Sequence, residues 1–150
     1  MSDRLAIPAL ILLFSLLWVP AGQHPFLLAN WVKIGTMAIP LLLLAAWRIR
    51  PQRAVLADSR FVSLTLLIAY NIHQFEEHWI DIFGRNYAFK PYLNTFLSDI
   101  SGQGTTAEFM TDASIFVINT SLVWLVAALA IWQGNRHIFA TLCMVAIVVV

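Results

Sequence analysis

Long apolar blocks, separated by short polar stretches, dominate the chain. Of its 150 residues, 60% are hydrophobic and only 11% are charged, whereas an ordinary soluble domain has about 25% charged residues. The blocks lack the alternation of apolar and polar residues that is typical of strands in a membrane barrel. The sequence therefore predicts an all-α, polytopic membrane protein with a single transmembrane domain over residues 1–150.

Four apolar segments come close to the 20 residues that a spanning helix needs, and a fifth is cut short. They cover residues 5–19, 26–47, 61–83, 113–133 and, as the partial one, 137–150. The first is short enough to be a cleaved signal peptide instead, because Val19-Pro20-Ala21 offers a small residue for cleavage. The last stops within a β-branched run, so we expect the natural chain to continue beyond Val150. Four complete transmembrane helices and a fifth partial one are predicted.

Basic residues are concentrated on one side of this predicted bundle. They are Arg4, Arg48, Arg50, Arg53, Arg60 and Arg136. Cytoplasmic loops carry an excess of Lys and Arg, so the N-terminus is expected inside, in the cytoplasmic or plasma membrane. A net charge of +1 without a basic patch argues against nucleic acid as a partner. The expected partner is the lipid bilayer, and the oligomeric state stays open.

A long connection at residues 84–111 is expected to lie on the outer side. Its first part mixes aromatic and polar residues, as segments in the membrane interface do. Thr105 and Glu108 have the spacing of a capping box, which predicts that the following helix begins near Thr106. Glu108, Asp112 and Asn119 would then lie within about 40° of one another on that helix.

The third segment contains His73-Gln74-Phe75-Glu76-Glu77. At 3.6 residues per turn, His73, Glu76 and Glu77 share one helix face. Ionisable groups at membrane depth cost on the order of 3 kcal/mol each and indicate a functional site by default. His73 and Asn119 both lie about 10 to 12 Å inward of an outer acidic residue, so we expect these two side chains to face each other.

Three other polar residues have less specific expectations. His78 and Asp81 fall near the membrane interface, where simple solvation is the expected role. Lys33 is expected to snorkel towards water, with a carboxylate partner as the alternative.

The pentapeptide from His73 to Glu77 resembles the signature of the HXXEE family, small multi-pass membrane proteins without an established function. The resemblance covers most of the chain, from the second helix to residues 116–119. It implies functional roles for His73, Glu76, Glu77 and, on another helix, Asn119. It also implies a further helix bearing Asn and His, which would lie beyond Val150.

These features favour an intramembrane metal-dependent enzyme that acts on a lipid or another amphiphile. His73, Glu77 and Asn119 would be ligands of a divalent metal, zinc or iron, and Glu76 the catalytic general base. One alternative is a proton-linked transporter or carrier that uses the same cluster. Another is a structural membrane subunit whose polar residues join helices. The sequence leaves open whether the chain is an enzyme, and it does not indicate a substrate or a reaction.

Overall fold

The computed structural model describes residues 3–49, 51, 54–81, 83–86, 89–102, 108–136 and 139–149. This part of the chain is helical and contains no strand, which confirms the all-α class. In chain order the elements are α1 (Asp3–Ala21), α2 (Pro25–Ile49), the 3-10 turn η1 (Val55–Ala57), α3 (Ser59–His78), α4 (Phe89–Ser101), α5 (Asp112–Val117), the π-helix η2 (Ile118–Trp124), α6 (Leu125–Gln133), the 3-10 turn η3 (Gly134–Arg136) and α7 (Phe139–Val149).

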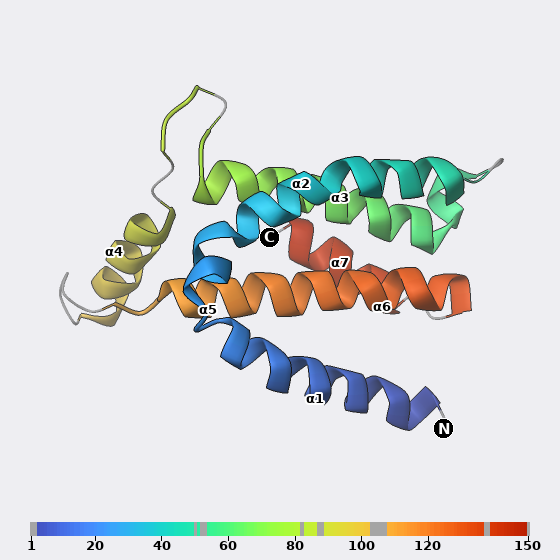
Figure 1. Cartoon of the computed structure of the whole chain (residues 1–150), viewed down its shortest axis with the longest axis horizontal. Coiled ribbons are helices and arrows are strands. Elements are labelled where there is room, and N and C mark those ends of the chain that lie inside the picture. Colours follow the sequence, from blue (N-terminus) through green and yellow to red (C-terminus); the bar gives the residue numbers. More distant parts are fainter. Residues whose placement is uncertain are drawn as a thin grey trace.

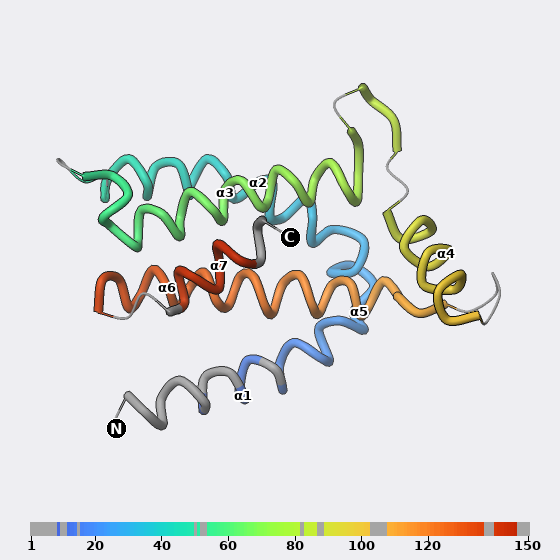
Figure 2. Tube along the Cα trace, turned by 180° about the vertical axis from the view of Figure 1, so that it is seen from behind, coloured from blue at the N-terminus to red at the C-terminus, as the bar shows by residue number. Residues whose placement is uncertain are grey.

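The elements α5, η2 and α6 follow one another without a break and form a rod through the middle of the molecule (Figure 1). On one side of this rod, α2 packs against α3, and the short α7 packs against both α3 and α6. On the other side, α1 approaches the rod at η2 and diverges towards the N-terminus, as Figures 1 and 2 both show. The helix α4 stands apart at one end of the bundle.

Two helical segments of the described chain are long and apolar enough to cross a membrane, Pro25–Ile49 and Asp112–Arg136. The sequence predicted four complete spanning helices and a fifth partial one. In the described residues, only these two segments have the length and apolar character of a spanning helix. The helix α3 has 20 residues, but Arg60, Glu76 and Glu77 lower its apolar character. The apolar stretch of α1 is shorter, Leu12–Ala21, and α7 has 11 residues.

Much of the apolar surface of α2 faces outward. Met37 is 78% exposed and Leu41 is 70% exposed, and only 11% of the most apolar window of this helix is buried. Exposed apolar patches of this kind mark surfaces that contact lipid or another protein.

The helix α3 ends earlier than the sequence predicts, at His78 and not near residue 83. Both the Trp79 and the Ile80 amides donate to the Phe75 carbonyl at 3.1 Å. The Asp81 carboxylate then accepts the backbone N–H groups of Phe83 and Arg85, each at 2.9 Å. A side chain that bonds backbone amides two and four residues ahead stabilises a turn in place of a helix, so Asp81 lies in a turn.

The helix of the rod also begins elsewhere than predicted. Thr111 is its N-cap and forms a capping box with Ser114, so the helix starts at Asp112. Thr105 and Thr106 lie outside the described residues. Glu108 precedes the helix and does not share a helix face with Asp112 and Asn119.

The π-helical segment coincides with three consecutive polar residues. Asn119, Thr120 and Ser121 each donate from the side chain to the carbonyl four residues earlier, at 2.9, 2.5 and 2.5 Å. In a regular α-helix these carbonyls accept hydrogen bonds from backbone amides. Side chains that compete for the same carbonyls bend or widen the helix. The segment also contacts α1, because the Thr120 hydroxyl accepts a hydrogen bond from the Trp18 indole N–H.

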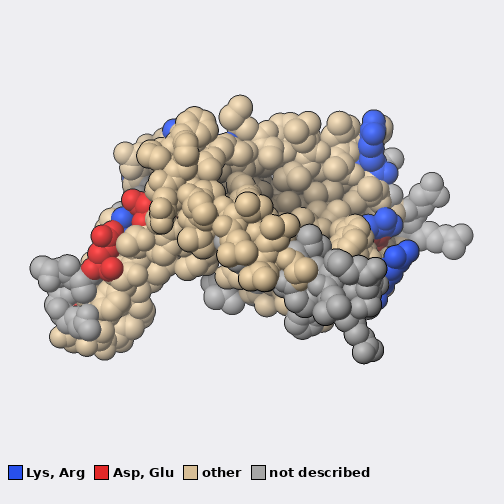
Figure 3. All heavy atoms as spheres, turned by 60° about the horizontal axis from the view of Figure 1, so that its bottom comes forward, with Lys and Arg blue, Asp and Glu red and all other residues tan. Residues whose placement is uncertain are grey.

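Charged residues separate to the two ends of the bundle (Figure 3). One end, which we name the arginine end, holds Arg48 in the last turn of α2, Arg60 in the first turn of α3, and Arg136 in η3. The opposite end, the carboxylate end, holds Glu108 and Asp112 beside α4. The long helices connect these two ends.

Candidate functional site

The His73–Glu77 pair predicted from the motif is present on α3. The Nε2 atom of His73 lies 3.2 Å from Oε1 of Glu77, one helical turn away. The His73 side chain is 57% exposed, while that of Glu77 is only 18% exposed. The carboxylate is therefore the inner member of the pair and the imidazole the outer one.

The second oxygen of Glu77 faces two more side chains of the same helix. Gln74 donates from Nε2 to Oε2 at 3.1 Å, and the Nε2 atom of His78 lies 4.0 Å from the same oxygen. One carboxylate thus lies between two imidazoles and is oriented by an amide. We name these four residues the Glu77 array: His73, Gln74, Glu77 and His78.

Glu76 does not join this array. It is half-buried, and it has no hydrogen bond or ion pair with any residue that the structure describes. The geometry assigns the central position to Glu77.

The expected contact between His73 and Asn119 is absent from the described residues. Asn119 accepts from the Tyr70 hydroxyl at 2.5 Å and donates to the Ile115 carbonyl. The prediction assumed that Asp81 of α3 lies at the same depth as Asp112. In the structure His78 lies at that depth, since His78 and Asp112 line one pocket. Asn119 is seven residues further along from Asp112, and the α3 residue at the same depth is Tyr70, eight residues before His78.

Metal ligands were predicted at His73, Glu77 and Asn119. In the described ranges, no group of three or more His, Cys, Asp or Glu side chains is placed to hold a metal ion. His73 and Glu77 are close enough to be two ligands of one ion, but Asn119 lies with Tyr70 and does not complete the set.

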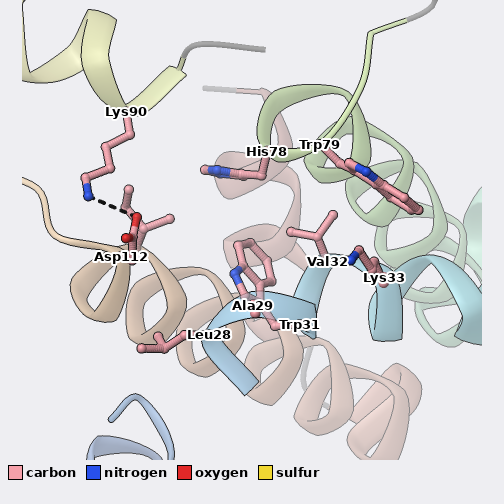
Figure 4. A pocket seen from close by; sticks show the side chains of 10 residues that line it. Leu28, Ala29, Trp31, Val32, Lys33, His78, Trp79, Lys90 and Asp112 are labelled. Carbon is pink, nitrogen blue, oxygen red and sulfur yellow. Dashed lines mark ion pairs between the residues drawn. The ribbon is translucent and has the colours of Figure 1, made fainter. Parts of the chain in front are cut away.

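A pocket lies directly beside the Glu77 array, at the carboxylate end (Figure 4). Its volume is about 220 Å³, and α2, α3, α4 and α5 all contribute side chains to its wall. Trp31 and Lys33 come from α2, His78 from the last turn of α3, Lys90 from α4 and Asp112 from α5. We name it the Lys33 pocket.

His78 connects this pocket to the array. Its ring lies between Trp31 and Phe89, with centroid distances of 5.3 Å to each, and its side chain is only 13% exposed. Its Nε2 atom is buried and has no hydrogen-bond partner among the described residues. His78 is thus part of the pocket wall, and the expectation of simple solvation at the interface is wrong.

The two lysines of the pocket differ in their partners. Lys90 contacts Glu108 at 2.8 Å and Asp112 at 3.0 Å. Lys33 has no carboxylate within ion-pair distance in the described part of the chain; its Nζ atom lies 3.4 Å from Asn30 Oδ1 and 5.1 Å from the Trp79 ring centroid.

Beyond the pocket, Asp81 forms a tight ion pair with Arg85. The guanidinium contacts Asp81 Oδ2 at 2.8 Å through both Nε and a terminal nitrogen. Hydrogen bonds from the Arg85 backbone and guanidinium hold the pKa of the Asp81 carboxyl below its usual value. This pair maintains the turn that follows α3.

The prediction from the motif missed most of the buried polar face of α3. Tyr70, Asn71 and Gln74 are buried. The row of polar side chains that they form on α3 continues to Glu77 and His78. The signal was present, because polar residues spaced three or four apart mark one side of a helix. That side faces other helices: Tyr70 contacts Asn119 of the rod, Asn71 lies at Gly35 of α2, and His78 packs on Trp31 and Phe89.

Comparison of the chain with protein-family models, with curated proteins and with solved structures finds no match in any of the three. The resemblance to the HXXEE family therefore stays a prediction.

Proposed function

We propose that the chain is a multi-pass membrane protein that acts as an intramembrane enzyme on a lipid or another amphiphile, with Glu77 as its acid–base residue. The helix α2 and the rod are long and apolar enough to span. At 1.5 Å per residue, the 20 residues of α3 reach about 30 Å, the thickness of a bilayer core. Packed between them, α3 would carry its ionisable end to one membrane surface.

The distribution of charge favours an external position for the site. Arg48, Arg60 and Arg136 share the arginine end, and an excess of basic residues is typical of the cytoplasmic side. The Glu77 array and the Lys33 pocket would then open towards the outer leaflet, with the N-terminus inside.

The observation that carries the proposal is the position of the Glu77 carboxylate between two imidazoles. A carboxylate within hydrogen-bond distance of an imidazole can orient it and exchange a proton through it, as general acid–base catalysis requires. A carboxylate with little exposure to water is costly, and the Glu77 side chain is only 18% exposed, which favours a functional role over an incidental one. A structural role remains the competing explanation, and the experiment below separates the two.

A metal-assisted version is the second candidate, and one distance favours it. Two ligands of a tetrahedral zinc ion, each about 2.0 to 2.1 Å from the metal, lie about 3.3 Å apart. The His73–Glu77 separation of 3.2 Å is compatible with this value as well as with a direct hydrogen bond between the two side chains. Water or substrate would supply the remaining ligands, and zinc and iron are both compatible with nitrogen and oxygen donors.

Proton-linked transport is less well supported by the same geometry. A relay across the membrane needs ionisable groups in both halves of the bundle. Among the described residues, a hydrogen bond of 3.0 Å joins two uncharged side chains, Ser63 of α3 and Thr141 of α7. The acidic residues and histidines of α3 lie in its last two turns.

Lipid turnover tests the proposal. The purified protein is placed in nanodiscs of a mixed lipid extract, with a chelator or with added Zn²⁺, and new products are measured by mass spectrometry. We expect a product that the His73→Ala variant forms much more slowly. Turnover that survives the chelator favours acid–base chemistry alone, whereas loss and recovery with Zn²⁺ favours the metal version. No product under any condition, with a folded protein, would support the structural role.

A further inference from the structure

We propose that the Lys33 pocket binds the anionic head of a single-tailed membrane amphiphile. This inference rests on the proposed function in one respect, since it names the substrate class of that site. The binding itself is a separate property that can be measured without turnover.

The first reason is that Lys33 has no carboxylate within ion-pair distance among the described residues, its neighbours being Asn30 Oδ1 and the Trp79 ring. Buried or half-buried charges are normally paired, because transfer of an unpaired charge out of water is costly. Lys33 is half-buried on an apolar helix, and its contact with Asn30 at 3.4 Å is longer than an ordinary hydrogen bond. An ammonium group has three donors, so a phosphate or carboxylate beside Lys33 would supply the missing acceptor and the missing charge.

Lys90 provides an internal comparison. It faces the same pocket, yet it is paired with two carboxylates, Glu108 and Asp112, and this group of three carries one net negative charge. The anion-binding capacity of the pocket is therefore concentrated at Lys33. The Nε2 atom of His78 is a second polar group in the same wall; it makes no hydrogen bond to a described residue, and the Glu77 carboxylate is 4.0 Å away from it.

The size of the pocket limits what enters it. At about 220 Å³ it is smaller than the roughly 300 to 1,000 Å³ of sites that enclose a whole drug-sized ligand. A polar head fits, but a hydrocarbon chain of an amphiphile does not. The chain has to remain outside the pocket.

The surface of α2 next to Lys33 accommodates such a chain. Met37, Leu41 and Leu44 follow Lys33 on the same side of the helix, at steps of four, eight and eleven residues. All three are exposed, by 78%, 70% and 49%. A tail that leaves the pocket along this apolar stripe would lie parallel to the helix, as lipid chains do in a bilayer.

Binding is tested by isothermal titration of the full chain in neutral detergent micelles at pH 8. The probes are dodecyl phosphate, dodecanoate, dodecanol and inorganic phosphate. We expect one equivalent of either charged amphiphile to bind, and neither dodecanol nor inorganic phosphate to bind measurably. Equal binding of dodecanol, or binding of inorganic phosphate as tight as that of dodecyl phosphate, would overturn the proposal. The two charged probes distinguish a phosphate head from a carboxylate head.

Three substitutions on α2 assign the site. Lys33→Gln should raise the Kd at least tenfold, Lys33→Arg should retain binding, and Arg48→Gln, at the far end of the same helix, should have no effect. Wild-type affinity in Lys33→Gln would overturn the proposal. If Lys33→Gln does not fold, Ala29→Leu, which reduces the pocket volume from α2, has to weaken binding instead.

Glu77→Gln separates this inference from the proposed function. Its turnover is measured beside the binding of the charged probes to Lys33→Gln. Loss of binding in Lys33→Gln together with unchanged turnover in Glu77→Gln would refute the proposed function only. Unchanged binding in Lys33→Gln together with lost turnover in Glu77→Gln would refute the binding site only.

Discussion

At the scale of single residues, Glu76 and Glu77 show how strongly position on a helix determines role. The two side chains have the same chemistry and adjacent positions, yet only Glu77 contacts His73 and Gln74. The motif identified this turn of α3 and both carboxylates. Residues three and four apart are neighbours on a helix, so spacing alone does not decide whether Glu76 or Glu77 contacts His73.

The Tyr70–Asn119 hydrogen bond gives a first prediction at this scale. It joins α3 to the π-helical segment at 2.5 Å, and hydrogen bonds between membrane helices contribute about 0.6 kcal/mol on average and up to about 1.7 kcal/mol. Tyr70→Phe should lower the free energy of unfolding by an amount in this range, measured by titration with a denaturing detergent. A double-mutant cycle with Asn119→Ala is the control, and a coupling energy of zero would refute the contact.

At the scale of elements, Gly35 is a tight contact between α2 and α3. A Cβ atom at this position would lie 2.3 Å from Asn71 Oδ1 and 3.2 Å from the Trp124 ring. The Asn71 amide is anchored on the Leu67 carbonyl at 2.9 Å, so it cannot move away without losing that bond. Small residues at helix contacts of membrane proteins allow this kind of approach.

Gly35→Ala should therefore destabilise the protein by about 1 to 3 kcal/mol, the usual cost of excess volume at a packed position. The same detergent titration measures the change. The double variant Gly35→Ala/Asn71→Ala removes the atom that the new methyl group meets, so it should be more stable than Gly35→Ala alone. A single variant as stable as the wild type would mean that the helices are not this close.

The helix α4 is held to the rod by two contacts one turn apart. Lys90 contacts Glu108 and Asp112, and the Asn94 amide exchanges hydrogen bonds with the Met110 backbone at 2.7 and 3.1 Å. Hydrogen bonds to Glu108 and Asp112 raise the pKa of the Lys90 ammonium above its ordinary value of 10.5. Because the pKa is raised, Lys90 contributes its full stabilisation of the contact between α4 and Asp112 below pH 10.5. This stabilisation is lost as the pH rises through the raised pKa.

A spin label at Thr95, in a Cys143→Ser background, reports on this attachment. We expect the label to be immobile in the wild type at neutral pH, more mobile in Lys90→Gln, and more mobile still in Lys90→Gln/Asn94→Ala. The wild type should gain mobility only above pH 10.5. Lys90→Arg is the control that retains the charge, and equal mobility in all variants would show that these contacts do not hold α4.

At the scale of the whole molecule, the sequence predicted the helical class and the approximate positions of the helices. Apolar runs determine both, because each run has to be buried or to face lipid. The π-helical segment and the end of α3 were not predicted, since they depend on side chains such as Asn119 and Asp81 that bond the backbone locally. The pairing of Asn119 with His73 failed for the same reason: the end of α3 sets the register between the helices.

Orientation in the membrane gives a prediction at this scale. A reporter fused after Arg53 should behave as cytoplasmic and one placed at Gly102 as external, because the arginine end is expected inside. Protease access in intact cells is a suitable measurement. The opposite pattern would place the Glu77 array at the inner leaflet.

The turnover rate of Glu77→Gln relative to Glu76→Gln tests the central claim most directly. Both changes remove one negative charge from the same turn of α3, so each serves as the control for the other. General acid–base groups contribute about 10² to 10⁴ in rate. The position of Glu77 between His73 and His78 therefore predicts a loss of at least a hundredfold in Glu77→Gln and a change of about twofold or less in Glu76→Gln. A large loss in Glu76→Gln with a nearly normal rate in Glu77→Gln would contradict it.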